Sequence, residues 1–316
     1  MKQKVAVLGE ALFDLIEQDN GSFMPFIGGS PYNVARGFVR QGLESHYLSP
    51  ISSDRFGKQI YQSIQEEGIF VPENNRSEKP TSLALVYRNQ QGNPDYRLYR
   101  QSVADLDISA QKLLATLPQN LSLFHTGSLA LVPHMLPVLL PVIQTLQQQR
   151  TPISLDVNVR LGVEPNHQAY TDAIMQCVAL ADIVKVSDED LLLMGLKGDP
   201  LTLAKSMLTM MTNGIVVLTL GEKGAFLLTE NICIEQHSYP PECFGDAVGA
   251  GDTFFSAMLS QLLRTQAFEI ATASEEIFAD ALKFASLAAT MNVEKTGCHP
   301  PSFEQVNERL AELSMP

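Results

Sequence analysis

Short apolar segments that read as β-strands alternate with longer segments of helical pattern along most of this 316-residue chain. Such an alternation favours a mostly parallel sheet whose two faces are both covered by helices, so it indicates an α/β protein. We predict strands at 5–8, 47–51, 121–125, 153–156, 183–186 and 215–220, and helices that include 136–148, 173–180 and 201–211.

Two early segments depart from this alternation. Residues 11–27 and 81–100 have the pattern of antiparallel β-ribbons, and residues 89–94 in the second have the composition of a turn. We interpret the two ribbons as a small β-sheet lid over the carboxyl ends of the main strands, where open α/β sheets bind their ligands.

Composition and charge exclude several classes of protein. A hydrophobic content of 45% with 18% charged residues is ordinary for a globular enzyme, and a net charge of -13 argues against a nucleic-acid partner. The most apolar stretch, residues 129–143, is short for a membrane span and contains three prolines. The four cysteines lack metal-ligand spacing. We therefore expect a cytoplasmic protein without a signal peptide, a membrane partner or a disulfide framework.

A turn of small residues precedes an apolar helical stretch at residues 246–252, DAVGAGD. Gly249, Ala250 and Gly251 clear side chains from the first N–H groups of that helix, which together with the helix dipole form a predicted anion site. A carboxylate at Asp252, beside the anion, suits a base that takes a proton from a hydroxyl attacking a phosphoryl group. The alternative is an ordinary glycine turn followed by an acidic first helical turn.

A second cluster of small and polar residues lies near the start of the chain. Asp14 lies in the first ribbon and Asn33 follows Gly28-Gly29, whose bare backbone allows a ligand to approach. A carboxylate and an amide beside glycines suit a polyhydroxylated ligand. Alternatively, Asp14 caps a strand end and Asn33 is a solvated helix residue. We predict that Ser30 caps this helix and that Pro31 takes its first position.

Polar residues also follow three later strands. Alternation in residues 156–160 predicts that Asp156, Asn158 and Arg160 point to one side, where Arg160 can bind phosphate oxygens; a structural Asp–Arg pair is the alternative. Residues 219–224 offer small residues to a nucleotide, or form a hairpin turn. Residues 185–190 are typical of a strand end, an N-cap and an acidic first turn.

Other phosphate-binding and catalytic motifs are absent from the sequence. The chain contains no GxxxxGK[ST], and Phe254 stands where a dinucleotide fingerprint needs its third glycine. Neither HExxH nor GxSxG occurs.

These motifs, in this order, give the chain a resemblance to the ribokinase-like (PfkB) family of carbohydrate kinases and, within it, to bacterial fructokinases. The resemblance covers nearly the whole length and rests on residues 9–15, 28–35, 99–100 with 104–105, 125–128, 156–160, 185–187 and 246–252. It implies a ribokinase-like three-layer α/β/α fold with a mostly parallel central sheet and a small β-sheet lid. Residues 1–316 are then a single PfkB-type kinase domain with lid segments at about 11–27 and 81–100.

The resemblance implies a role for each motif. Asp252 is the implied catalytic base, and the amides of Gly249, Ala250 and Gly251 form the implied anion hole. The implied sugar-binding residues are Asp14, Gly28, Gly29, Asn33, Arg100 and Arg160, and the implied nucleotide-binding residues are Asn158, Lys185, Ser187, Thr219, Gly221, Gly224 and Asn292.

The family uses MgATP and commonly binds a monovalent cation, for which K⁺ is the candidate. Its Asn-x-x-Glu motif for Mg²⁺ and phosphates is replaced here by Ser187 and Asp190, and the shorter Asp190 is expected to reach Mg²⁺ through water. The monovalent cation is expected next to Asp246 and Val248.

The resulting prediction is transfer of the ATP γ-phosphoryl group to a primary hydroxyl of a ketohexose, converting fructose to fructose 6-phosphate. A kinase of 2-keto-3-deoxygluconate, with Arg100 or Arg160 binding the carboxylate, remains an alternative. So do a nucleoside-type (aminoimidazole riboside) kinase and a non-catalytic sugar sensor. Unpaired edges of the lid predict a homodimer formed through it.

Overall fold

The computed structural model describes residues 2–88, 94–268 and 273–314, so most of the predicted turn at 89–94 lies outside the described residues. Its main sheet has eight strands in the order β14-β13-β12-β11-β10-β9-β1-β4. The strands from β12 to β4 are parallel and the two at the other edge are antiparallel, which confirms a mostly parallel sheet. The bounds are β1 Lys4–Leu8, β4 Glu44–Tyr47, β9 Leu121–Gly127, β10 Ile153–Asp156, β11 Ile183–Ser187, β12 Ile215–Thr219, β13 Ala225–Leu228 and β14 Cys233–Gln236.

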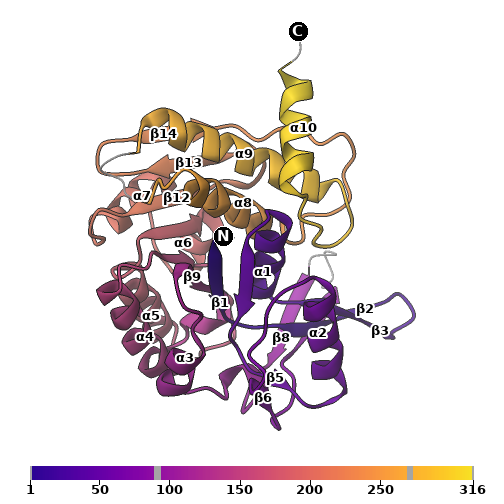
Figure 1. The fold of residues 1–316 in the computed structure, drawn as a ribbon. Helices are drawn as coiled ribbons and strands as arrows, with labels where there is room; N and C mark the ends of the chain where they lie inside the picture. Colours follow the sequence, from indigo (N-terminus) through magenta and orange to yellow (C-terminus); the bar gives the residue numbers. More distant parts are fainter. Residues whose placement is uncertain (1, 89–93, 269–272, 315–316) are drawn as a thin grey trace.

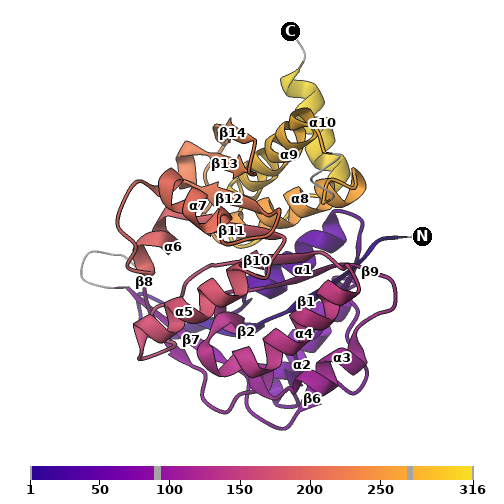
Figure 2. The same cartoon turned by 90° about the vertical axis from the view of Figure 1, so that its left-hand side faces the viewer.

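Helices cover both faces of this sheet, which makes three layers (Figures 1 and 2). In β1, Val5 and Val7 belong to one buried core and the residues that alternate with them belong to the other, as a strand buried on both faces requires. The first core includes α1 Ser30–Arg40, α2 Arg55–Glu66, α8 Ala250–Arg264, α9 Glu275–Val293 and α10 Phe303–Leu313. The second includes α3 Ala110–Thr116, α4 Leu136–Gln148, α5 His167–Val178, α6 Asp188–Leu193 and α7 Pro200–Leu208.

The two predicted ribbons join into one smaller sheet of order β3-β2-β7-β8. Each ribbon is antiparallel, and β2 pairs with β7 in parallel. Figure 1 shows β2 and β3 extending sideways from the body of the protein. The bounds are β2 Leu12–Glu17, β3 Phe23–Gly28, β7 Leu83–Arg88 and β8 Pro94–Tyr99. We keep the name lid for this sheet.

The prediction of a strand at residues 47–51 was wrong. The chain leaves the main sheet after β4, and its next strand, β5 (Ile51–Ser52), pairs with β6 (Arg76–Ser77) in a separate two-stranded sheet. Pro50 stands between β4 and β5, and it has no N–H with which to continue a ladder.

Two helices begin earlier than predicted because polar residues cap them. Asn166 caps α5 and Asp199 caps α7, each by accepting a bond from a first-turn N–H. The described residues also form four short 3₁₀ segments: η1 Ala104–Leu106, η2 Ser128–Leu131, η3 Pro133–Met135 and η4 Gly221–Lys223.

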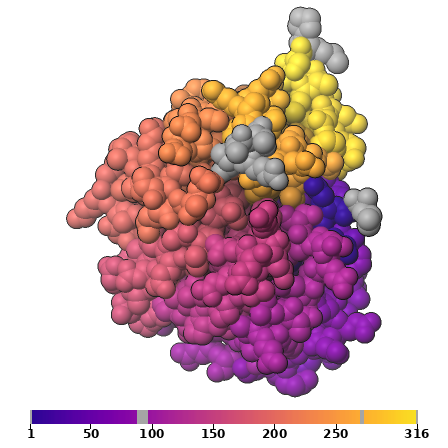
Figure 3. All heavy atoms as spheres, turned by 60° about the vertical axis from the view of Figure 1, so that its left-hand side comes forward, coloured from indigo at the N-terminus to yellow at the C-terminus, as the bar shows by residue number. Residues whose placement is uncertain are grey.

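Helix α10 stands out from the rest of the surface at the carboxyl-terminal end of the chain (Figures 1 and 3). Across residues 2–88, 94–268 and 273–314, none of the helices combines the length and apolar character needed to cross a lipid bilayer.

Candidate active site

The segment that the sequence marks as an anion site forms the start of α8. Its N-cap, Gly249, has a left-handed φ of 72°, and a Cβ there would lie 2.3 Å from Sγ of Cys298, so only glycine suits the position. The N–H of Ala250 bonds to the carbonyl of Ala247 at 3.2 Å. Within the described part of the chain, the N–H groups of Gly251 and Asp252 have no backbone acceptor, so they are available to an anion.

The carboxylate of Asp252 is held from the first turn of α1. Ser30 Oγ donates to Oδ1 at 2.6 Å, and Asn33 Nδ2 donates to Oδ2 at 2.8 Å. Burial raises the pKa of Asp252, while these two bonds and the charges of Lys185 and Arg160 oppose the rise. Asp252 is thus a buried carboxylate with a raised pKa beside unpaired N–H groups.

The structure corrects one expectation for α1 and excludes one alternative. Gly29 is the N-cap and Ser30 is already helical, and the Ser30 hydroxyl bonds to Asp252 instead of capping the helix. Asn33 is buried rather than solvated, because α1 packs directly against α8. Sequence reasoning missed the contact of Ser30 because its partner lies 222 positions away.

Asp14 of β2 lies against the backbone that leads into α1. A Cβ on Gly28 would approach Asp14 Oδ2 to 2.1 Å, so this glycine allows the close contact of the two strands. Burial raises the pKa of Asp14 to about 6, and the charge of Arg160 counteracts it. The structure therefore places Asp14 and Asp252 at opposite ends of the same short segment, Gly28 to Asn33, with Arg160 acting on both carboxylates.

The stretch predicted to alternate, residues 156–160, is strand only at its first residue. Strand β10 ends at Asp156, and Asn158 takes a left-handed φ of 35°. Val157 and Val159 nevertheless both pack in the second core. Asp156 pairs with Lys185, at 2.9 Å, instead of forming the alternative Asp–Arg pair. Arg160 is exposed and donates to the carbonyl of Val159.

Lys185 lies beside the glycine turn. A Cβ on Gly251 would be 3.5 Å from Lys185 Nζ, and that ammonium bonds to both oxygens of Asp156. Burial disfavours its charge, but Asp156 and Asp190 outweigh burial and raise the pKa of Lys185. A buried positive charge therefore lies next to the proposed anion-binding groups.

Ser187 and Asp190 form the capping box of α6. Asp190 Oδ2 accepts from Ser187 Oγ and Ser187 N, and Oδ1 accepts from Val159 N at 2.7 Å. These bonds tie α6 to the loop after β10. The expected Mg²⁺ role of Asp190 stays a prediction, and both of its oxygens already have donors.

Asn292 of α9 is fully buried and shapes the turn before α8. Its Nδ2 donates to the carbonyl of Val248 at 2.8 Å, and its Oδ1 accepts from Thr253 Oγ1 and His299 N. Asp246 accepts from Val248 N and from Gly297 N. The amide of Asn292 thus links the turn before α8, the first turn of α8 and the loop after α9. Its predicted nucleotide contact remains a prediction.

The other predicted nucleotide residues border a hairpin. Thr219 ends β12, Gly221 begins η4, and Gly224 leads into β13. The loop is therefore the hairpin turn named as the alternative, and a nucleotide contact at its surface stays a prediction.

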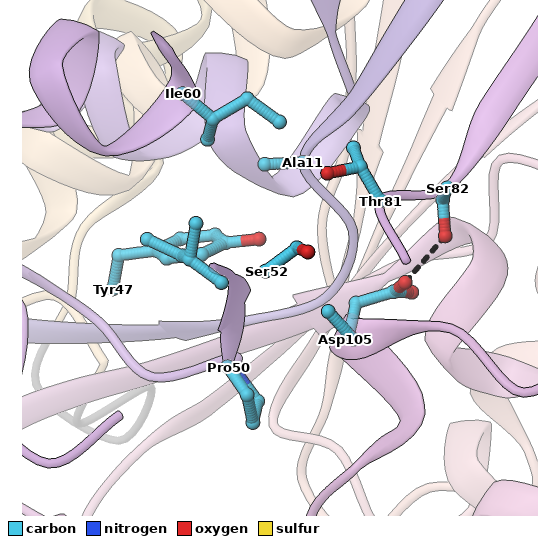
Figure 4. Close-up of a pocket in the computed structure, with 10 residues that line it drawn as sticks. Ala11, Tyr47, Pro50, Ser52, Ile60, Thr81, Ser82 and Asp105 are labelled. Carbon is cyan, nitrogen blue, oxygen red and sulfur yellow. Dashed lines mark hydrogen bonds between the residues drawn. The ribbon is translucent and has the colours of Figure 1, made fainter. Parts of the chain in front are cut away.

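Arg100 follows lid strand β8 and its guanidinium is already bonded. Nε and Nη2 donate to Oδ2 of Asp105 at 2.9 and 2.6 Å, and Nη1 donates to the carbonyl of Leu129. Its side chain is 8% exposed. Asp105 also accepts from Ser82, beside a cavity of about 10 Å³, the size of one water molecule (Figure 4). Arg100 therefore anchors the lid, and these bonds leave the guanidinium little capacity for a sugar.

The chain matches a known protein family over most of its length. A model described as "pfkB family carbohydrate kinase" matches residues 2–305. The chain belongs to this family. The pfkB assignment confirms the kinase class and the ribokinase-like fold expected from the motifs, and it makes this protein a member of an ATP-dependent family of sugar kinases.

Individual pfkB relatives agree in length and architecture. A fructokinase of Rhizobium leguminosarum bv. trifolii is 29% identical over 260 residues, which cover 80% of this chain and 78% of that protein. A fructokinase with bound ATP from Xylella fastidiosa has a TM-score of 0.88 at 23% identity, with 100% of both chains covered. Aminoimidazole riboside kinase from Salmonella enterica, complexed with aminoimidazole riboside and an ATP analog, has a TM-score of 0.80 at 22% identity and covers 98% of this chain and 100% of that chain.

Glu10 of this pfkB kinase was not among the predicted site residues. It follows β1, is 2% exposed, and its Oε2 has no hydrogen-bond partner among the described residues. Burial raises the pKa of Glu10 to about 7, against the charge of Arg100. Its presence within the first motif was the one signal in the sequence, and the buried position could not be inferred from it.

Proposed function

We propose that this pfkB kinase transfers the γ-phosphoryl group of ATP to a primary hydroxyl of a ketohexose, and that fructose is converted to fructose 6-phosphate. The observation that carries the proposal is the buried Asp252 carboxylate beside the free N–H groups of an α8 amino terminus. A base next to an anion site suits phosphoryl transfer to a hydroxyl. Relatives that carry the name fructokinase support fructose as the acceptor.

In this mechanism Asp252 removes the proton of the attacking hydroxyl. General-base catalysis contributes about 10²–10⁴-fold, or about 3–5 kcal/mol of activation free energy. The backbone of Gly249, Ala250 and Gly251 stabilises charge on the transferred group, which contributes a comparable amount. Of these three residues, Gly249 and Gly251 have an N–H without a backbone acceptor among the described residues, and Lys185 adds a positive charge beside Gly251.

The sugar is bound between the lid and α1. Ionised Asp14 accepts bonds from vicinal hydroxyls, and Asn33, which already donates to Asp252, connects the sugar to the base. Gly28 and Gly29 let the chain lie against the Asp14 carboxylate and the Glu10 backbone, which keeps Asp14 next to α1. Exposed Arg160 completes the proposed group of sugar-binding residues. The occupied guanidinium of Arg100 supports the lid rather than the sugar, a revision of its predicted role.

ATP is bound on the other side of the anion site. The proposed contacts are Asn158, Lys185, Ser187, Thr219, Gly221, Gly224 and Asn292. Mg²⁺ bound with ATP would neutralise phosphate charge. It would need few protein carboxylates, because this ion keeps several of its waters. Asp190 is the residue that would face it through water. K⁺ is proposed next to Asp246 and Val248, whose loop supplies the carboxylate and carbonyl oxygens that such a cation prefers.

We also propose that residues 1–316 act as one kinase domain and that two copies pair through their lids. Strand β3 is an edge of the smaller sheet, and its Phe23, Met24 and Phe26 are exposed. The molar mass from light scattering tests the pairing, and a monomeric mass at working concentration would exclude it.

The first experiment measures initial rates of ADP release with MgATP and a panel of acceptors: fructose, mannose, ribose, 2-keto-3-deoxygluconate and aminoimidazole riboside. We expect the highest kcat/KM for fructose and a 6-phosphate product by ³¹P NMR. Preference for 2-keto-3-deoxygluconate would overturn the sugar assignment and indicate Arg160 as the carboxylate ligand. Binding of sugar without turnover of any acceptor would favour a sensor over a kinase.

A further inference from the structure

The proposed base is held by two donors that differ in their relation to the substrate. Ser30 Oγ and Asn33 Nδ2 approach different oxygens of Asp252, and all three residues are less than 9% exposed. Asn33 belongs to the predicted sugar site and can exchange its bond for one to the ligand. Among the described residues, the Ser30 hydroxyl forms no second hydrogen bond, so its bond to Asp252 has no local competitor.

Ordinary helix chemistry does not account for the Ser30 hydroxyl. A serine at a helix start normally bonds to a first-turn N–H, but the N-cap of α1 is Gly29 and α1 has no side-chain cap bond. The hydroxyl instead crosses to α8. Pro31 and the packing of α1 on α8 fix the position from which it donates.

We propose that Ser30 is a positioning residue for the catalytic base: its hydroxyl fixes Oδ1 of Asp252 so that Oδ2 faces the acceptor hydroxyl of the sugar. This proposal rests on the kinase function proposed above. Each carboxylate oxygen can accept two hydrogen bonds, so Oδ2 can receive the substrate proton while Asn33 remains beside it.

The transfer step balances with Ser30 unchanged. The O–H bond of the acceptor breaks and its proton goes to Oδ2 of Asp252. The acceptor oxygen forms a bond to the γ-phosphorus as the bond from that phosphorus to the β,γ-bridging oxygen breaks, and ADP leaves. The proton of Ser30 stays on Oγ throughout, so Ser30 orients the base without exchanging a proton.

Loss of this bond has a predictable effect on the titration of Asp252. A hydrogen bond donated to a carboxylate favours its ionised form, so its removal raises the pKa further. The other charged or titratable groups that act on Asp252 are Lys185 from β11, Asp156 from β10, Arg160 from the loop after β10 and Cys298 from the loop after α9. Burial raises the pKa of Cys298 to about 12, so this thiol stays neutral in the working range.

The test compares Ser30→Ala and Ser30→Thr with a matched control, Ser256→Ala. Ser256 lies in the same α1–α8 contact, but its hydroxyl bonds to the carbonyl of Thr253 and not to Asp252. We expect Ser30→Ala to lower kcat about tenfold and to move the acid limb of the kcat–pH profile up by about one unit, with KM for the sugar little changed. Ser30→Thr, which keeps the hydroxyl, should restore the wild-type limb, and Ser256→Ala should match the wild type.

A second readout does not require turnover. Selective ¹³Cγ labelling of aspartate, with Asp252→Asn used for assignment, reports the titration of the Asp252 carboxyl by NMR. A raised pKa in Ser30→Ala supports the positioning role. An unchanged kcat, acid limb and ¹³C titration in Ser30→Ala would overturn it. If the wild type turns over no sugar but the ¹³C titration shifts, the kinase proposal fails while the orienting bond to Asp252 stands.

Discussion

Replacement of Asp252 by asparagine tests the base assignment with little change of shape. The wild-type carboxylate accepts one bond from Ser30 and one from Asn33. The amide has a single acceptor oxygen, which can keep the bond from Asn33. Its NH₂ group then faces Ser30, whose hydroxyl can rotate and accept. Because both contacts can be rebuilt, we expect Asp252→Asn to fold.

The effect on activity should be much larger than the effect on stability. Exchange of a hydrogen-bonded carboxylate for an amide changes the free energy of unfolding by about 1–3 kcal/mol. Removal of the general base lowers kcat by about 10²–10⁴-fold, which equals about 3–5 kcal/mol of activation free energy. Sugar affinity should remain close to the wild type, because Asp14 and the glycines are untouched.

The assay measures kcat by ADP release at saturating MgATP and sugar, Kd for the sugar by calorimetry, and Tm by differential scanning fluorimetry. Asp182→Asn is the control. Asp182 is also a carboxylate with a raised pKa that accepts a backbone N–H, but it is only partly buried and lies at the amino-terminal edge of β11. A folded Asp252→Asn variant that binds sugar and keeps more than about a tenth of wild-type kcat would refute the base assignment.

The glycine turn, the anchor of the lid and the Asp14 carboxylate can each be tested by a single substitution. Gly249→Ala places a Cβ against Cys298 at a backbone position with a left-handed φ, and this displaces the turn. We expect kcat/KM for MgATP to fall about tenfold or more. An unchanged value would count against the anion hole. Arg100→Ala breaks a buried ion pair with Asp105 and should lower the free energy of unfolding by about 3–5 kcal/mol in urea titrations. A stable variant with a raised KM for the sugar would instead show that Arg100 binds substrate. Asp14 is ionised above its pKa of about 6, so KM for the sugar should rise as pH falls below that value. Asp14→Asn should abolish this dependence, and an unaltered pH profile would assign it to another group.

Much of the fold and part of the site followed from local patterns. The alternation of strands and helices predicted a mostly parallel sheet because strand and helix periods are local properties of the chain. The DAVGAGD segment predicted a helix start with Asp252 in its first turn, since small residues and an acidic residue favour that conformation locally. The two ribbons were also visible in the sequence, although their parallel pairing through β2 and β7 was not.

Contacts between distant segments could not be predicted in the same way. Arg100 was expected to bind sugar, but in the structure its guanidinium donates hydrogen bonds to Asp105 and to the carbonyl of Leu129. Asn292 was expected beside a nucleotide, and its amide bonds to the turn before α8. A polar side chain bonds to whatever the fold brings within about 3 Å, and the sequence does not contain that information in any local pattern.

Local sequence patterns alone were enough to propose which residues carry the chemistry: a base in a first helical turn, a glycine turn before it, and a carboxylate near a second glycine pair. How these residues lie relative to one another became visible only in the folded protein. Ser30 and Asn33 meet Asp252 across 222 and 219 positions, in a contact set by how α1 packs on α8. The packing of two helices depends on the shape of every side chain between them, so the orientation of the proposed base is a property of the folded core.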